Sequence, residues 1–323
     1  MKVGQVPSLE AIRAEFPALR SGFVFLENAG GSQVPHRVID AMGRFMVEDY
    51  VQTGAGYPAS DRATDLAARA KEFVTRLVGG EDAGCCVFGA SATALISMLA
   101  ECWSRVLVAG DEIVVSVANH EANIGAWLRL ERLGIIIVWW SVDPESGASD
   151  LDELAKLFSP RTRLVAYPMT SNLLGDLAPV RQINRMAHDV GAKVVVDGVA
   201  FTSHGLPDVL RDETDFFVYS CYKVYGPHVA VMFGRTDAWA DLKGPNHFFV
   251  RDDELPRKFE LGCLPYESLA GVLALGEYLG FLTGSTGTLL ETVRTACKPL
   301  GEPAHARTQR RMAGLHPVPS IRT

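Results

Sequence analysis

The most informative part of the sequence is Val194-Val-Val-Asp197, followed by Phe216-Phe-Val-Tyr-Ser-Cys-Tyr-Lys-Val-Tyr-Gly-Pro227. Both stretches begin as continuous apolar runs, which are typical of strands buried on both faces of a parallel sheet. Asp197 ends the first run, and Lys223 follows the second run closely. Because the carboxyl ends of parallel strands meet at the edge where such sheets bind ligands, these two side chains are predicted to lie together there.

Apolar strand-like runs alternate with helical patterns on both sides of this stretch. Strands are predicted at 112–116, 135–140, 164–168, 193–196, 216–220 and 229–233. Helices are predicted at 8–16, 91–106, 122–133, 151–158 and 180–190, with Ser8 and Asp150 as N-terminal caps. The uncharged stretch 83–100 is interpreted as a strand, a tight turn and a buried helix. This alternation predicts an α/β fold, a mainly parallel sheet sandwiched by helices.

Composition and charge exclude several classes of protein. The 323 residues are 48% hydrophobic and 21% charged, which is ordinary for a globular protein and predicts about two domains. The net charge of −7 argues against a nucleic-acid-binding surface. The cysteines form no Cys-x-x-Cys pair, so we expect no zinc or thioredoxin-like site but reduced thiols in a cytoplasmic protein. The N-terminus lacks the apolar core of a signal peptide, and no membrane association is expected.

An acid and a lysine at one sheet edge suit a specific chemistry. A carboxylate there can hold a cationic ring nitrogen, and a desolvated lysine can form a Schiff base. Pyridoxal 5′-phosphate (PLP) needs both, because the protonated ring acts as an electron sink. The pair alone leaves a simpler alternative open: Asp197 could cap a turn, and Lys223 could be a solvated loop lysine.

Longer motifs point to a known family. The strings 197–200 and 220–227 resemble the PLP-lysine motif of class V aminotransferases, and more narrowly that of the cysteine desulfurase and selenocysteine lyase-like branch. The resemblance runs from about residue 23 to 279. It includes Phe25-Leu-Glu-Asn-Ala-Gly-Gly-Ser32, Gly110-Asp-Glu-Ile-Val114 with Asn119-His-Glu-Ala-Asn123, and Thr170-Ser-Asn-Leu-Leu-Gly175 followed by Pro179. It implies the large domain of the fold type I PLP-dependent transferases.

The resemblance implies a role for each matching residue. Lys223 would be the Schiff-base lysine and proton shuttle, and Asp197 would pair with the pyridinium nitrogen. His120 would stack on the cofactor ring, which makes Lys223, His120 and Asp197 the predicted catalytic residues. Asn172 would bond the ring oxygen. Without the family context, His120 could instead be a surface or capping residue, and Asn172 an ordinary turn asparagine.

The phosphate site is predicted at Phe88-Gly-Ala-Ser-Ala-Thr-Ala94, where a helix begins. The free N–H groups and the dipole of a helix N-terminus suit a dianion. The predicted contacts are the amides of Ala92 and Thr93, the Thr93 hydroxyl and Ser220. A small-residue turn needed only for packing would have the same sequence. No Gly-x-x-x-x-Gly-Lys-Ser/Thr or Gly-x-Gly-x-x-Gly string occurs, which disfavours a P-loop or an NAD site.

Three positions depart from the family pattern. Tyr222 stands where many desulfurases have a phosphate-binding histidine, although a phenol can still donate to phosphate. Ala200 stands where a glutamine usually approaches the ring oxygen, and it cannot hydrogen-bond. Cys263 stands where relatives often carry a threonine that reaches the phosphate of the neighbouring subunit.

The expected organisation has three parts. Residues 1–20 form an N-terminal segment on the small-domain side, 21–285 the PLP-binding large domain, and 286–323 a basic, proline-containing tail that we expect to be loosely ordered. The tail matches nothing in the family's small domain, so a truncated ending is expected. That domain carries the substrate-binding arginine and, in desulfurases, the sulfur-accepting cysteine; neither role transfers to residues of the tail, Cys297, Arg307, Arg310 and Arg311.

The predicted function is a PLP-dependent enzyme that acts on an amino acid through Lys223. Cysteine desulfurase-like, lyase-like or aminotransferase-like chemistry fits best, and epimerisation or elimination would use the same residues. The alternative is a PLP-binding or PLP-fold protein with little or no catalysis, because the substrate arginine is missing. A homodimer with a shared active site is expected, in which segments 54–62 and 262–263 reach the partner's phosphate.

Overall fold

The computed structural model describes residues 7–143, 145 and 147–283. The predicted boundary at residue 286 and the whole tail that follows it lie outside these residues. The same holds for the first residues of the N-terminal segment.

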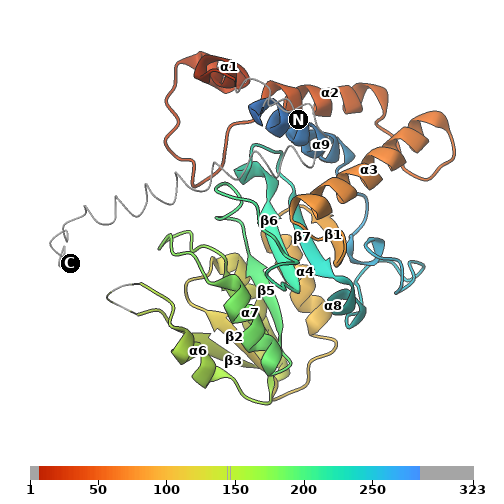
Figure 1. The fold of residues 1–323 in the computed structure, drawn as a ribbon. Coiled ribbons are helices and arrows are strands. Elements are labelled where there is room, and N and C mark those ends of the chain that lie inside the picture. The colour runs from red at the N-terminus through yellow and green to blue at the C-terminus, as the bar shows by residue number, and fades with distance from the viewer. Residues whose placement is uncertain (1–6, 144, 146, 284–323) are drawn as a thin grey trace.

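The centre of the molecule is a 7-stranded sheet with the order β1-β7-β6-β5-β4-β2-β3 (Figure 1). Its strands are β1 Gly84–Gly89, β2 Glu112–Ser116, β3 Ile136–Trp140, β4 Thr162–Pro168, β5 Lys193–Asp197, β6 Phe216–Ser220 and β7 Ala230–Arg235. The five neighbouring strands β3, β2, β4, β5 and β6 are parallel to one another, whereas β7 is antiparallel to both β6 and β1. The predicted mainly parallel sheet is therefore confirmed.

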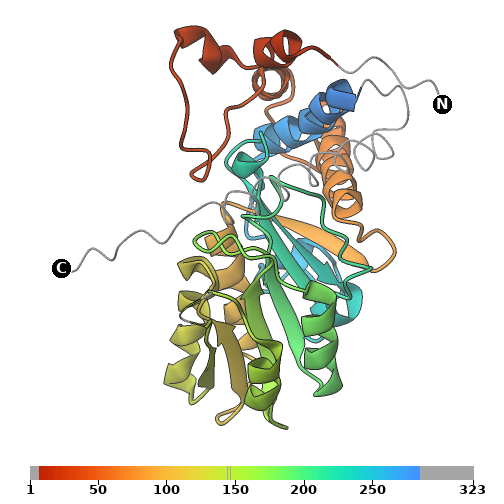
Figure 2. The same ribbon diagram turned by 60° about the vertical axis from the view of Figure 1, so that its left-hand side comes forward.

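Helices cover both faces of this sheet (Figures 1 and 2). The α-helices of the described residues are α1 Leu9–Ala14, α2 His36–Glu48, α3 Pro58–Leu77, α4 Ala92–Trp103, α5 Gly125–Leu128, α6 Leu151–Leu157, α7 Val180–Asp189, α8 Thr236–Ala240 and α9 Tyr266–Thr283, of which α1 and α2 lie at one end of the sheet. Successive strand residues point to opposite faces. Val194 and Val196 accordingly join the core under α3, α6, α7 and α9, while Val195 joins the core under α4, α5 and α8. The predicted α/β/α sandwich is confirmed.

The predicted helix caps are also confirmed. Ser8 Oγ accepts a hydrogen bond from the Ala11 N–H at 3.2 Å, and Asp150 Oδ1 accepts one from the Asp152 N–H at 2.8 Å. The single helix predicted over 122–133 is wrong. It is divided into a 3-10 turn at Glu121–Asn123, the short α5, and a second 3-10 turn at Arg129–Leu133, with Ile124 at φ −118° and ψ −66° between the first two. The break lies at Ile124, whose backbone departs from helical geometry, and the His120 side chain caps the start of the first turn.

The N-terminal segment is fastened to the helices at one end of the sheet. The buried carboxylate of Glu15 accepts two hydrogen bonds from Arg37 of α2, at 2.7 and 2.8 Å. The Arg37 guanidinium lies 4.9 Å from the ring centre of Phe281 in α9. These contacts connect three segments that are far apart in the chain, and Figure 2 shows them grouped above the sheet.

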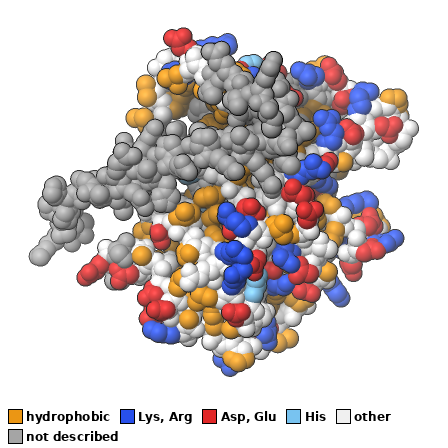
Figure 3. Space-filling view, viewed as in Figure 1, with side chains coloured by type: hydrophobic (Ala, Val, Ile, Leu, Met, Phe, Trp, Pro, Cys, Tyr) orange, Lys and Arg blue, Asp and Glu red, His pale blue; other side chains and the backbone are white. Residues whose placement is uncertain are grey.

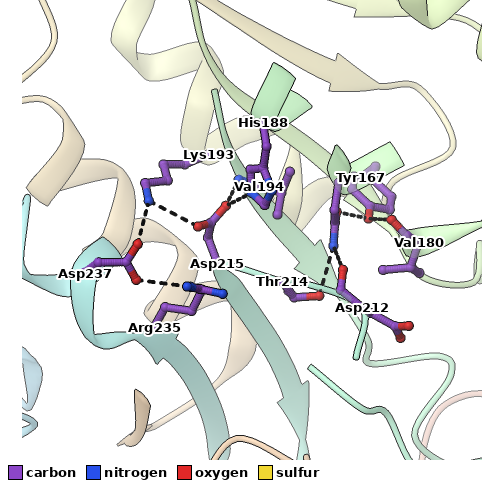
Figure 4. A network of polar contacts seen from close by, with 11 residues as sticks. Tyr167, Val180, His188, Lys193, Val194, Asp212, Thr214, Asp215, Arg235 and Asp237 are labelled. Carbon is purple, nitrogen blue, oxygen red and sulfur yellow. Dashed lines mark hydrogen bonds and ion pairs between the residues drawn. The ribbon is translucent and has the colours of Figure 1, made fainter. Parts of the chain in front are cut away.

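A polar network lies at the end of the sheet where strands β5 and β6 begin (Figure 4). Asp215, only 2% exposed, accepts the Val194 N–H at 2.9 Å and pairs with Lys193 at 3.3 Å and His188 at 2.8 Å. Burial alone would lower the pKa of Lys193, but Asp215 and Asp237 raise it. The network fixes the starts of the two strands whose far ends carry Asp197 and Lys223.

Replacing Asp215 with asparagine is expected to lower the free energy of unfolding by about 2 kcal/mol, the cost of losing charge-assisted hydrogen bonds at a buried group. Urea denaturation followed by circular dichroism measures this change. The matched control is Asp241→Asn, at an exposed acid that ends α8, where we expect less than about 0.5 kcal/mol. Equal unfolding midpoints for the two variants would contradict the structural role of Asp215.

Acidic and basic side chains are mixed on the face of the molecule that is drawn in Figure 3. Figure 3 shows Lys and Arg beside Asp and Glu across one face. Arg181 and Arg185 both pair with Glu213 in this way. Among the described residues, no helix is both long and apolar enough to span a membrane.

Candidate active site

A cavity of about 90 Å³ lies at the carboxyl edge of the sheet. It is formed where β2, β4, β5 and β6 end and where α4 begins. Every residue predicted to touch the cofactor lines it: Ala92, Thr93, His120, Asn172, Asp197, Ser220, Tyr222 and Lys223. The structure therefore brings the predicted site residues together, although their chemical roles stay predictions. Ala200, a departure from the family pattern, also lines this cavity.

Asp197 is the last residue of β5 and is 4% exposed. Its Oδ1 accepts the Val199 N–H at 2.9 Å. Burial raises the pKa of this carboxyl group, while the Val199 bond and the electrostatic effects of nearby His120 and Lys223 oppose the rise. A buried carboxylate of this kind gains most from a cation placed beside it. Gly198 follows it because a Cβ there would lie 2.0 Å from Cζ of Phe217.

Lys223 ends a 3-10 turn, Cys221–Lys223, directly after β6. Its Nζ donates a hydrogen bond to the Ala29 carbonyl at 2.6 Å. The turn is closed by the N–H groups of Val224 and Gly226, which both donate to the Cys221 carbonyl at 2.9 Å. The amine is therefore held on one side of the cavity by a segment from the N-terminal part of the chain.

His120 lies just beyond β2 and caps the turn that follows it. Its Nδ1 accepts the Ala122 N–H at 3.1 Å, so a neutral imidazole carries its proton on Nε2. Beneath it, buried Asn119 donates to the Ala166 carbonyl at 2.9 Å and accepts from Asn123 at 3.0 Å. These bonds tie the His120 segment to β4.

Sequence reasoning missed the asparagines beside His120. Asn123 also accepts the indole N–H of Trp127 at 3.0 Å, which makes a continuous chain of buried side-chain hydrogen bonds. The pattern Asn119-His-Glu-Ala-Asn123, with two asparagines flanking the histidine, is the signal that could have identified them.

Asn172 lies in the loop after β4, and its neighbour Ser171 fixes that loop. The buried Ser171 hydroxyl donates to the Ala118 carbonyl at 2.9 Å. The loop with Asn172 and the loop with His120 are therefore joined by a direct bond. Ser171 was also missed, because nothing in the sequence relates it to Ala118.

The N-terminus of α4 forms the predicted phosphate end of the cavity. A helix leaves its first backbone N–H groups without partners inside the helix. Ser91 Oγ accepts a hydrogen bond from the Ala94 N–H at 3.1 Å. Within the part of the chain that the structure describes, the N–H groups of Ala92 and Thr93 are left available for an anion. Tyr222 reaches the same cavity, and its ring stacks on His228 at 5.2 Å between centroids.

Cys263 lines a different and larger cavity, of about 670 Å³, together with mostly apolar side chains such as Phe45 and Leu261. Its thiol donates to Oε1 of Gln52 at 3.4 Å. Close by, the hydroxyl groups of Thr53 and Tyr266 lie 3.0 Å apart. Cys263 of the predicted segment 262–263 is therefore bonded next to the start of the predicted segment 54–62; that the two reach a partner's phosphate stays a prediction.

The other described cysteines are poor nucleophiles. Burial raises the pKa of Cys221 and of Cys102 to about 12 and that of Cys85 to about 11, and it raises the pKa of Cys86 as well. Since the thiolate is the reactive form, these thiols are unsuited to accept sulfur at neutral pH. Cys297 lies outside the described residues.

Comparison with known proteins identifies the family. The sequence profile of the class V aminotransferases matches residues 24–287. The chain therefore belongs to the class V aminotransferase family, whose members are PLP-dependent, and the prediction from its motifs is confirmed. The aminotransferase-like protein FGM3 of Gibberella zeae is 36% identical over 84% of this chain and 69% of its own length.

Other relatives place the chain near the cysteine desulfurases. The cysteine desulfurase-like protein ustD of Aspergillus flavus is 32% identical over 81% of this chain, which spans 61% of ustD. The crystal structure of the cysteine desulfurase CsdA from Escherichia coli superimposes with a TM-score of 0.77 at 26% identity, covering 96% of this chain and 78% of CsdA. The fold prediction is thus confirmed by a solved structure as well.

Proposed function

We propose that the chain binds PLP in the 90 Å³ cavity and acts on an amino acid there. One observation carries the proposal: the buried carboxylate of Asp197, the amine of Lys223 and the N-terminus of α4 converge on this single cavity. They fit the three recognisable parts of the cofactor, its ring nitrogen, its aldehyde and its phosphate. When bound, PLP supplies an electron sink for the bonds at the substrate α-carbon.

The residues divide the work by chemistry. Lys223 holds the cofactor aldehyde and then moves the proton of the substrate α-carbon. Asp197 keeps the ring nitrogen protonated, and His120 covers one face of the ring. Asn172 orients the ring oxygen, and α4 with Thr93, Ser220 and Tyr222 holds the phosphate. Ala200 adds no hydrogen bond, so the ring oxygen depends on Asn172.

The reaction that we propose is desulfuration or a related lyase step, or transamination. Relatives described as cysteine desulfurases and as aminotransferase-like both support it. The second candidate, a PLP-binding protein with little catalysis, is favoured by one feature. Apart from residues that the structure does not describe, no arginine lines the cofactor cavity to grip a substrate carboxylate.

Titration of the purified full chain with PLP tests the proposal. The cofactor should acquire the visible absorbance band of a lysine-bound form, and borohydride should then fix it to Lys223, as peptide mass spectrometry can show. Addition of cysteine and other amino acids, with alanine, sulfide and keto-acid detection, separates the reactions. A stable band without any turnover would favour the non-catalytic candidate, and no band at all would refute PLP binding.

We also propose that residues 21–285 form the cofactor domain and that two copies share their active sites. The 670 Å³ apolar cavity beside the start of α4 supports this, because Leu261, 60% exposed, and Cys263 line it without closing it. Apolar surface of this kind is typical of an interface.

Leu261→Asp is expected to shift the chain to a monomer and to weaken PLP retention at least about tenfold, the effect of roughly 1.4 kcal/mol. Light scattering and PLP titration measure the two effects. Leu133→Asp is the matched control, at an exposed leucine outside this cavity. A wild-type monomer that retains PLP tightly would contradict the shared site.

A further inference from the structure

Ser32 bonds to both sides of the turn that carries Lys223. Its N–H and its hydroxyl both donate to the Tyr222 carbonyl, at 3.0 and 2.9 Å. The same hydroxyl oxygen accepts the Tyr225 N–H at 2.7 Å. A hydroxyl has one donor and two acceptor sites, so these bonds can exist at the same time. One side chain thus holds the residue before Lys223 and the second residue after it.

The turn needs such an external hold. Tyr225 has φ +68°, in the left-handed region that residues with a Cβ rarely adopt. A conformation of this kind persists only where its surroundings impose it. The Tyr225 ring adds contacts to Phe16, 5.7 Å away, and to Tyr278 of α9, 5.5 Å away between centroids. The backbone N–H of Tyr225 is the point at which Ser32 acts.

The segment that contains Ser32 also touches the lysine amine. We call residues 28–32 the strap. Within it, the Ala29 carbonyl accepts the hydrogen bond from Lys223 Nζ at 2.6 Å, and a Cβ at Gly31 would lie 3.2 Å from Cδ2 of Tyr222, so strap and turn are in close contact. The strap therefore meets the turn at the amine itself and at the backbone on both sides of it.

We propose that Ser32 is a positioning residue for Lys223. By holding the turn in its strained form, the strap places the amine opposite Asp197 and presents it to the cofactor aldehyde in one orientation. The inference rests on the proposed function, because Lys223 is assumed to be the PLP lysine. It goes further by making the N-terminal strap, remote in sequence, part of the cofactor site.

The test compares Ser32→Ala, Ser32→Thr and Ser104→Ala in the full chain. Ser104 is a partly exposed serine at the end of α4 whose hydroxyl donates one local hydrogen bond at 2.7 Å, so it controls for the loss of a hydroxyl. Ser32→Ala should raise the dissociation constant for PLP about tenfold, the effect of 1.4 kcal/mol. It should also shift the pH midpoint of the visible band. Ser32→Thr, which keeps the hydroxyl, should restore both values.

If Ser32 only stabilised the fold, the Ser32→Ala variant would behave differently. Ser32→Ala would then melt at a lower temperature with wild-type PLP affinity and an unchanged pH midpoint, and this outcome overturns the proposal. If Ser32→Ala fails to fold, hydrogen exchange of the wild-type chain decides. The Tyr225 amide should be protected, and rapid exchange of this amide would refute the proposed bond from Ser32. The proposed function fails separately, when the wild type itself shows no lysine-bound PLP.

Discussion

Replacing Lys223 with alanine is expected to abolish the visible band of bound PLP and its fixation by borohydride. Activity toward any amino acid should fall by about 10⁴-fold, the upper end of what one positioned proton-transfer group contributes. The expectation follows from geometry, because Lys223 lines the cavity that also contains Asp197 and the start of α4. No other lysine lines that cavity among the described residues.

The control for this variant is Lys243→Ala, at an exposed lysine outside the cavity. It should keep the band, the borohydride product and the turnover of the wild type. Absorbance titration, peptide mapping and product assays measure these quantities. A Lys223→Ala variant with wild-type turnover would eliminate the proposed chemistry. A cofactor fixed by borohydride to a different lysine would show that PLP is bound elsewhere in the chain.

The predictable part of the fold is the part with local signals. The strands from β2 to β6 are apolar runs bounded by polar or turn residues, and their predicted positions agree with the structure to within about two residues. Three long helices, α2, α3 and α9, were not predicted from the sequence. Helix α9 is buried on several sides, with Leu269, Val272 and Leu275 in the core, so an amphipathic pattern is absent. Helices α2 and α3 are amphipathic, with Val38 and Phe45 of α2 and Phe73 of α3 buried, so their pattern was present in the sequence and was missed.

The site divides in a similar way. Asp197 and Lys223 could be predicted to lie together because the carboxyl ends of parallel strands meet at one edge of the sheet. The contacts of Ser32 and Ser171 could not, although both residues lie in motifs recognised in the sequence, because their bonds to Tyr222 and Ala118 join segments that are distant in the chain. Hydrogen bonds between loops depend on the three-dimensional arrangement, which residue spacing alone does not contain.

Asp197→Asn is expected to lower turnover about 10²–10³-fold, the usual loss when a preorganised charge beside the reacting system is removed. Asparagine can still accept the Val199 N–H through its Oδ1, so the local backbone should stay in place. The variant should bind PLP with a weakened preference for the protonated ring. Steady-state kinetics and the absorbance of the bound cofactor measure both effects.

Although Asp197→Asn should lower turnover, it should stabilise the cofactor-free chain at neutral pH. Burial raises the pKa of Asp197, so the folded chain binds this proton more tightly than the unfolded chain does. Its contribution to stability is fully present below the unfolded pKa and is lost as the pH rises through the raised folded pKa. At neutral pH the apo Asp197→Asn variant should therefore melt above the apo wild type, and this advantage should vanish in acid.

With PLP bound, the order of the two melting temperatures should reverse, because the carboxylate then faces a cationic nitrogen. An apo variant that melts below the wild type at neutral pH would show that the carboxylate already has a sufficient partner in the protein.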